Sequence, residues 1–309
     1  MSTSSKYLAP LGVYGFDDVE PVMLAALVTE DPMLLIGQSG TGKTYLLNTI
    51  SEALGLEHRH YNASLISFDD LVGFPYPDEA NGGVRFLETP ATVWGAESVL
   101  IDEISRCKPE HQNRLFALVH ERRIQGIALP TLRYRWAAMN PCSGDQSSLD
   151  DYAGSEPLDP ALADRFALFI EAADWQELSD EARSSIAQPG GEGRIADDGG
   201  VLKAQIQVWR EDFLRQVDRA PAGMVEYAVA ATSALNTAGV RISPRRARLI
   251  ARSLPTTTAG SPLAILSRTF SASARLHVTP IQVVSPSDHS PPRRSRGVQA
   301  SRKLAKTRS

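Results

Sequence analysis

A glycine-rich loop that directly follows a short apolar run constrains this chain more than any other feature. Residues 37–44 read Gly-Gln-Ser-Gly-Thr-Gly-Lys-Thr and match the pattern G-x-x-x-x-G-K-[ST] in full. The apolar residues 33–36 predict a buried strand, and residues 45–50 predict a helix. Backbone N–H groups of such a unit can surround a phosphate chain. The sequence therefore predicts an α/β fold with a nucleoside triphosphate site, against the alternative of a chance glycine turn.

Each residue of this loop has an expected part in the site. Lys43 is expected to reach the β- and γ-phosphates, and the hydroxyl of Thr44 is expected to ligate Mg²⁺. The other positions supply backbone donors. The residues expected to bind the nucleotide are thus Gly37, Gln38, Ser39, Gly40, Thr41, Gly42, Lys43 and Thr44.

A second motif ends an apolar run that shows no polar alternation. Residues 98–101 are typical of a central parallel strand covered on both faces, and Asp102 and Glu103 follow them. Asp102 is expected to hold the water shell of Mg²⁺, and Glu103 to polarise a water for attack on the γ-phosphate. Such a pair is often only a solvated turn, but its presence together with the loop favours the catalytic interpretation.

Composition sets the class of protein and its expected location. A chain of 309 residues with 42% hydrophobic content can form one large domain or two of ordinary size. Its longest apolar runs are too short to span a bilayer, and its first residues lack the apolar core of a signal peptide. Cys107 and Cys142 fit neither a disulfide framework nor a zinc spacing. We therefore expect a cytoplasmic protein.

The net charge of −4 is distributed unevenly along the chain. From residue 261 onward the sequence has nine Lys or Arg and one acidic residue, Asp288, so this end carries +8 and the rest −12. The acidic body argues against a general nucleic-acid surface, whereas the basic end leaves room for a local electrostatic contact. The low-complexity composition from residue 285 predicts disorder.

The first half of the chain contains further predicted elements. A helix is expected from Pro21 to Thr29, and its start either borders an adenine pocket or is simply core. A short strand is expected at 57–62, and a brief helix at 64–73. Prolines and glycines then predict a small excursion from the main sheet. His58 and His60 could suggest a metal, but no further Cys or His lies at ligand spacing, so ordinary strand histidines are favoured.

The second half of the chain predicts one more motif and a change of architecture. An amphipathic helix is expected at 109–123, and a hairpin at 124–136 with its tip near Pro130. The hairpin's second arm continues into a central strand that ends at Asn140. A buried strand is expected at 167–171, after Arg165, whose plainest role is a salt bridge with Asp164 or a neighbouring carboxylate. Beyond Asp174 we expect helices, at 201–217, 223–237 and 244–254.

Five motifs in this order resemble those of the AAA+ ATPases, and more closely the MoxR-like and dynein-related (midasin-like) branch. They correspond to Walker A at 37–44, Walker B at 100–106, sensor 1 at 137–141, the arginine-finger corner at 163–166 and sensor 2 at 242–245. The resemblance implies a P-loop NTPase fold of the α/β class, with a parallel sheet sandwiched by helices and a smaller α-helical lid. The domains expected are 1–174 for nucleotide binding, 175–260 for the lid and 261–309 for a flexible basic tail.

The same resemblance implies roles and assemblies that the residues alone do not. Asn140 would position the attacking water, Arg165 would reach the γ-phosphate of a neighbouring subunit, and Arg245 would contact the nucleotide from the lid. ATP and Mg²⁺ are the implied ligands, and a ring, commonly a hexamer, is the implied assembly. The excursion at 73–86 looks like the helix-2 insert of this branch, and 124–136 like the hairpin before sensor 1. Such loops usually face the pore or the substrate.

The function that this resemblance implies is ATP hydrolysis coupled to remodelling, activating or assembling a partner protein, often one with a von Willebrand factor A domain. A nucleic-acid motor or restriction-type NTPase is the alternative that the basic tail suggests, and a small-molecule P-loop kinase is a third. Two departures from the branch stand out. Ser105-Arg106-Cys107 replaces Asn-Arg-Ala, and lid helices do not clearly continue after Leu254.

Overall fold

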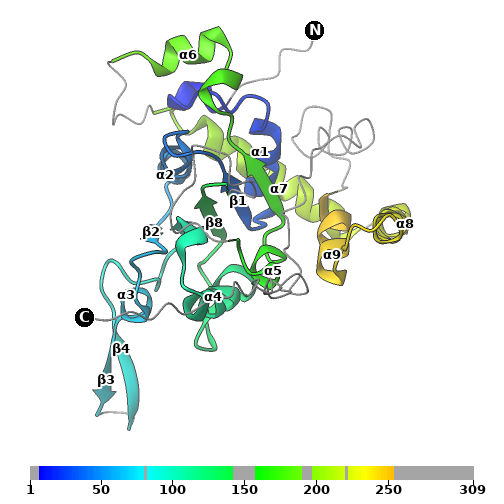
Figure 1. The fold of residues 1–309 in the computed structure, drawn as a ribbon. Coiled ribbons are helices and arrows are strands. Elements are labelled where there is room, and N and C mark those ends of the chain that lie inside the picture. The colour runs from blue at the N-terminus through cyan, green and yellow to red at the C-terminus, as the bar shows by residue number, and fades with distance from the viewer. Residues whose placement is uncertain (1–6, 80–81, 142–156, 190–196, 220–221, 254–309) are drawn as a thin grey trace, which may run out of the picture. The chain divides into compact units, whose positions relative to one another are not determined.

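A five-stranded parallel sheet forms the centre of the protein (Figure 1). The computed structural model describes residues 7–79, 82–141, 157–189, 197–219 and 222–253. The sheet has the order β2-β5-β8-β1-β9, and every neighbouring pair is parallel. Its strands are β1 (Met33–Ile36), β2 (His58–Asn62), β5 (Ser98–Asp102), β8 (Tyr134–Met139) and β9 (Leu168–Glu171). The predicted α/β class and parallel sheet are confirmed.

Helices pack against both faces of this sheet, because successive strand residues point to opposite sides and both sides are apolar. On one face, Met33 and Leu35 contact a core built with α1 (Glu20–Thr29), α2 (Lys43–Leu54) and α7 (Val201–Asp218). On the other, Leu34 contacts a core built with α3 (Phe68–Val72), α4 (Pro109–Phe116) and α5 (Pro160–Ala163). The expected sandwich is therefore present.

Two small hairpins project from the main sheet. The predicted excursion forms β3 (Phe74–Asp78) and β4 (Gly83–Leu87), an antiparallel pair. The second hairpin pairs β6 (Arg123–Ile124) with β7 (Ile127–Ala128). The prediction that the tip of this hairpin lies near Pro130 is wrong. The turn is Gln125-Gly126, whose φ angles of 50° and 79° match a two-residue hairpin loop, and the buried residues of β8 join the main sheet instead.

The helical segments follow the predicted positions with local changes. The helix expected at 64–73 is confined to α3, which Ser67 caps and Gly73 ends. The helix expected at 109–123 is α4 followed by a π-helical turn, Ala117–Glu121. The remaining segments are α6 (Asp180–Ile186), α8 (Ala222–Thr237), α9 (Pro244–Ser253), and three 3₁₀ turns: Ala9–Leu11, Ile104–Arg106 and Trp175–Glu177.

Helix α7 belongs to the same core as α1 and α2, because its side chains Leu202, Ile206 and Phe213 are buried there. The expected division of the chain near residue 174 stays a prediction. The expected basic tail and Cys142 lie outside the described residues. Within the described ranges, no helix is long and apolar enough to cross a membrane.

Buried charges connect α7 and α9 to the corner between α1 and β1. Glu30 is only 4% exposed and lies close to Arg133 at 2.7 Å, Arg210 of α7 at 3.0 Å and Arg122 at 3.5 Å. Its neighbour Asp31 pairs with Arg252 of α9 at 3.6 Å. Removing one partner of a buried ion network leaves an uncompensated charge, so this corner favours one arrangement of the elements around it.

Candidate active site

The glycine loop turns between β1 and α2 at the carboxyl edge of the sheet. Gly40 and Gly42 have φ angles of 83° and 80°, a conformation that favours glycine, and Gly42 caps the start of α2. Gly37 is required for a different reason, since a Cβ there would lie 2.8 Å from the Cβ of Ala172. These glycines let the loop fold tightly around the side chain of Lys43.

Lys43 lies inside the loop and is only 8% exposed. Its Nζ donates to the carbonyl oxygens of Gly37 and Gln38, both at 2.7 Å, and to Oδ1 of Asn140 at 3.3 Å. Burial lowers the pKa of Lys43, against the attraction of Asp102 and Glu103. The ammonium group is thus directed to where phosphates of a nucleotide would lie, and Asn140 approaches it from the end of β8.

Asp102 is held by several donors at the end of β5. Thr44 donates to Oδ2 at 2.7 Å, His60 lies 3.3 Å from the same oxygen, and the N–H of Glu103 donates to Oδ1 at 2.9 Å. Burial alone would raise the pKa of Asp102, but the hydrogen bonds from His60, Thr44 and Glu103 outweigh it and lower the pKa. The carboxylate is therefore charged at neutral pH.

Glu103 follows in an unusual backbone conformation. Its φ of 53° places it in the left-handed region, which non-glycine residues seldom occupy. The carboxylate lies 3.2 Å from Nη1 of Arg106, on the same 3₁₀ turn. Such outliers are concentrated at functional sites, where the surrounding structure maintains them.

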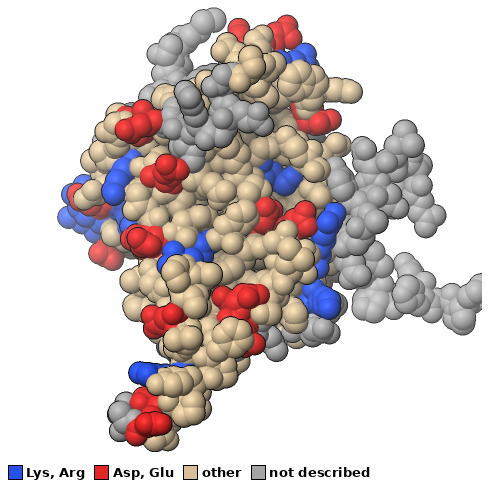
Figure 2. Space-filling view, turned by 90° about the vertical axis from the view of Figure 1, so that its left-hand side faces the viewer, with Lys and Arg blue, Asp and Glu red and all other residues tan. Residues whose placement is uncertain are grey.

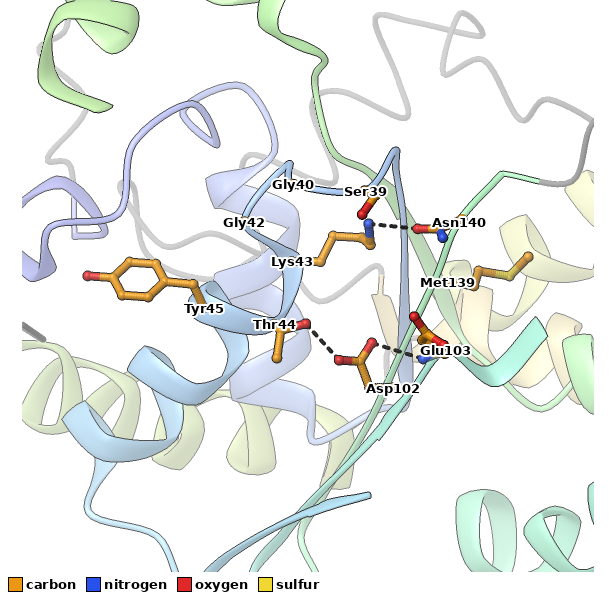
Figure 3. Close-up of a pocket in the computed structure, with 10 residues that line it drawn as sticks. All are labelled: Ser39, Gly40, Gly42, Lys43, Thr44, Tyr45, Asp102, Glu103, Met139 and Asn140. Carbon is orange, nitrogen blue, oxygen red and sulfur yellow. Dashed lines mark hydrogen bonds between the residues drawn. The ribbon is translucent and has the colours of Figure 1, made fainter. Parts of the chain in front are cut away.

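These side chains line one pocket of about 290 Å³ (Figure 3). Figure 3 shows Lys43, Thr44, Asp102 and Glu103 converging on it, with Asn140 at the far side. The sequence analysis predicted all five as residues of one nucleotide site. It had not anticipated His60 beside Asp102, Arg106 beside Glu103, or Tyr45 and Met139 in the lining. Knowledge that β2 lies next to β5 would have indicated that His60 can lie near Asp102.

The two predicted arginines, Arg165 and Arg245, lie away from the pocket lining. The guanidinium of Arg165 lies 4.2 Å from the centre of the Phe116 ring and donates to the carbonyl of Ala161. Arg245 pairs with Asp164 at 2.5 Å. Asp164 therefore has Arg245 rather than Arg165 as its ion-pair partner, together with Arg246 at 3.2 Å.

The oxygen donors of the pocket fit a magnesium ion. Hard oxygen ligands are what Mg²⁺ prefers, and Thr44 and Asp102 already place a hydroxyl and a carboxylate 2.7 Å apart. No group of three or more His, Cys, Asp or Glu residues capable of holding a metal occurs in the described part of the chain. Mg²⁺ commonly keeps several waters and binds one or two protein oxygens plus substrate phosphates, so this donor set suits it.

Comparisons with known proteins agree with this geometry. Residues 32–166 match the family described as AAA domain (dynein-related subfamily). Among solved structures, the chain resembles a "putative ATPase" from Cytophaga hutchinsonii ATCC 33406, with a TM-score of 0.59 and 17% identity over 84% of this chain and 83% of that one. At this identity the likeness concerns the fold. Comparison with curated proteins gives no match.

Proposed function

We propose that this chain, whose residues 32–166 match an AAA domain of the dynein-related subfamily, is a MoxR-type AAA+ ring ATPase. Hydrolysis of ATP would serve to remodel, activate or assemble a partner protein in the cytoplasm. The observation that carries the proposal is the convergence of Lys43, Thr44, Asp102, Glu103 and Asn140 on one pocket. The partner, for which a von Willebrand factor A domain protein is the leading candidate, follows from the resemblance of the motifs.

The residues of the pocket divide the work of hydrolysis. When the nucleotide binds, Nζ of Lys43 leaves the carbonyl oxygens of Gly37 and Gln38 and donates to the β- and γ-phosphates, whose negative charge it offsets. Thr44 and Asp102 would hold Mg²⁺, which would neutralise charge on the phosphates. Glu103 accepts the proton of the attacking water after it leaves Arg106, and Asn140 orients that water. Catalysis therefore consists mainly of positioning and charge stabilisation.

We propose that Arg165 and Arg245 act on the nucleotide of a neighbouring subunit in a ring, most simply a hexamer. Support comes from the pairing of Arg245 with Asp164, the residue directly before Arg165, and from the absence of both arginines from the lining of the described pocket. An arginine supplied by another subunit connects hydrolysis to assembly, so the specific activity should rise with protein concentration.

Mixing two inactive variants tests this arrangement. Lys43→Ala and Arg165→Ala should each be inactive alone, yet a Lys43→Ala subunit can lend its Arg165 to a neighbour whose Lys43 is intact. ATPase activity should therefore recover in mixed rings. The matched control mixes Lys43→Ala with Glu103→Gln, because every subunit then lacks a residue of its own pocket and no recovery is expected. Rings shown to contain both variants of the first mixture but without recovered activity would refute the role of Arg165 in trans.

A further inference from the structure

The β3–β4 hairpin exposes an unusual amount of apolar surface. Phe74, Tyr76, Val84 and Leu87 are 63%, 44%, 68% and 58% exposed. Scattered apolar residues on a surface are ordinary, but several on one projecting element mark an interaction site. The active site does not use any of them. The hairpin therefore needs a role of its own.

The hairpin is held firmly at its base. At Gly73, where φ is 84°, a Cβ would lie 2.0 Å from the carbonyl oxygen of Leu87, so only glycine allows the two strands to meet there. The rings of Phe86 and Trp94 lie 6.4 Å apart, and the indole of Trp94 donates to the carbonyl of Val72 at 2.8 Å. These contacts present the hairpin as a defined element, which Figure 1 shows extending away from the main sheet.

The two edges of the hairpin differ in their hydrogen-bonding capacity. Pro75 pairs with Phe86 and Pro77 pairs with Val84. Because proline has no N–H, these are the non-hydrogen-bonded pairs of the ladder, and their backbone groups point outward. The outer edge of β3 therefore lacks donors at both prolines. The outer edge of β4 keeps the N–H and C=O of Val84 and Phe86, for which no backbone partner occurs among the described residues.

Proline at an edge is a common way to prevent strand addition, so β4 is the edge that remains able to pair. One face beside it is apolar and aromatic, formed by Phe74, Leu87 and Tyr76, with the guanidinium of Arg85 stacked 4.3 Å from the Tyr76 ring. Carboxylates surround the hairpin, and Figure 2 shows acidic side chains around its projecting tip. By chain position, Asp78 and Glu79 are at the tip, and Asp69, Asp70 and Glu88 are near the base. The surroundings therefore favour a partner with basic side chains.

We propose that the outer edge of β4 binds an extended segment of the partner polypeptide as a third strand, with apolar side chains alternating with Lys or Arg. Backbone hydrogen bonds to Val84 and Phe86 supply the affinity of such an addition, and side chains select the segment. The inference deepens the proposed function, since it assumes that the partner is a protein.

A fluorescein-labelled peptide with alternating Val and Lys residues is a suitable probe, measured by fluorescence anisotropy with the full-length chain. Two further peptides separate the contributions. One has methyl groups on alternate backbone nitrogens, which removes donors and keeps the charge, and the other has Glu in place of Lys. We expect the parent peptide to bind at least about tenfold more tightly than either. On the protein, Val84→Pro should weaken binding by a similar factor, and Val84→Thr, which keeps the N–H, should not.

The outcomes are distinguishable. Equal affinity of the parent and methylated peptides for the wild-type chain would overturn the proposal even if Val84→Pro fails to fold. Altered sedimentation of Val84→Pro would assign the edge to a second copy of the chain. Zero-length cross-links from Glu79 or Glu88 to Lys303 or Lys306, if they form and prevent peptide binding, would assign the edge of β4 to the chain's own tail. Normal ATPase activity without peptide binding refutes only the hairpin inference, whereas absent ATPase activity in the wild type refutes the proposed function.

Discussion

Replacing Asp164 by Asn should loosen α9 and slow ATP hydrolysis, because this carboxylate holds the start of α9 against the end of α5. Its oxygens accept from Ser243 at 2.8 and 3.0 Å, from Arg245 at 2.5 Å and from Arg246 at 3.2 Å. Asn keeps the size of the side chain and one acceptor oxygen. The variant thus loses charge-assisted contacts without creating a cavity.

The magnitude follows from how exposed these groups are. The side chains of Asp164, Arg245 and Arg246 are 24%, 31% and 25% exposed. A hydrogen bond to a charged group contributes ~1.5–3 kcal/mol when well shielded, and an exposed ion pair ~0–1 kcal/mol. At intermediate exposure, each arginine contact is worth about 1 kcal/mol. The loss of both is about 2 kcal/mol, which raises the population with α9 detached roughly 30-fold.

Hydrogen exchange measured by mass spectrometry reports this population. The amides of α9 should exchange roughly 30-fold faster in Asp164→Asn, while those of α2 keep their rates. If Arg165 and Arg245 act together, kcat should also fall at unchanged ATP affinity. The matched control is Asp180→Asn, since Asp180 pairs with Arg183 but is 97% exposed and should change neither quantity. Equal exchange of α9 in Asp164→Asn and wild type would refute the reasoning.

Three further predictions concern the pocket and its support. Lys43→Ala should abolish ATP binding in calorimetric titration, because it removes the charge that the loop directs at the phosphates. Glu103→Gln should still bind ATP while kcat falls about 10²–10⁴-fold, and a change within about threefold would contradict the role of Glu103. Burial, with His60 and Arg59, lowers the pKa of His58 to about 4. Below about pH 6.5 the unfolded state binds a proton at His58 that the folded state does not bind. The free energy of unfolding of the wild type, measured with urea, should therefore fall by up to about 3 kcal/mol between pH 6.5 and 4. His58→Gln should not show this loss.

The strands around the nucleotide site could be predicted because their signal is local. Residues 33–36 and 99–101 are apolar without alternation, which a parallel strand covered on both faces requires. Each of these strands leads directly into a motif, so the motif residues were placed with it. In parallel strands the carboxyl ends meet at one edge of the sheet, which is why Lys43, Asp102 and Asn140 could be brought together without knowledge of the strand order.

The turn of the second hairpin was predicted wrongly because the local sequence pattern is compatible with two arrangements of the chain. Residues 124–136 contain two β-prone runs around Pro130, and proline suggested the turn. The second run instead joins the centre of the sheet, where all six side chains of β8 are buried, and burial on this scale outweighs a local hairpin. The actual turn uses Gln125, whose left-handed conformation its residue type does not indicate.

Partners of charged side chains were the least predictable feature, and they bear on what α9 can do. Arg245 was placed correctly on a helix, but that position did not indicate Asp164 as its partner. The other end of α9 is also held, because Arg252 donates to the carbonyl of Thr29 at 3.1 Å and lies 3.6 Å from Asp31. Turning Arg245 toward its own pocket by moving α9 would break contacts at both ends. A ligand can drive such a movement only by binding the moved state more tightly by at least that free energy. The nucleotide of a neighbouring subunit could approach Arg245 in its present position without breaking these contacts. This favours a contact of Arg245 with the nucleotide of a neighbouring subunit over one with the nucleotide of its own subunit.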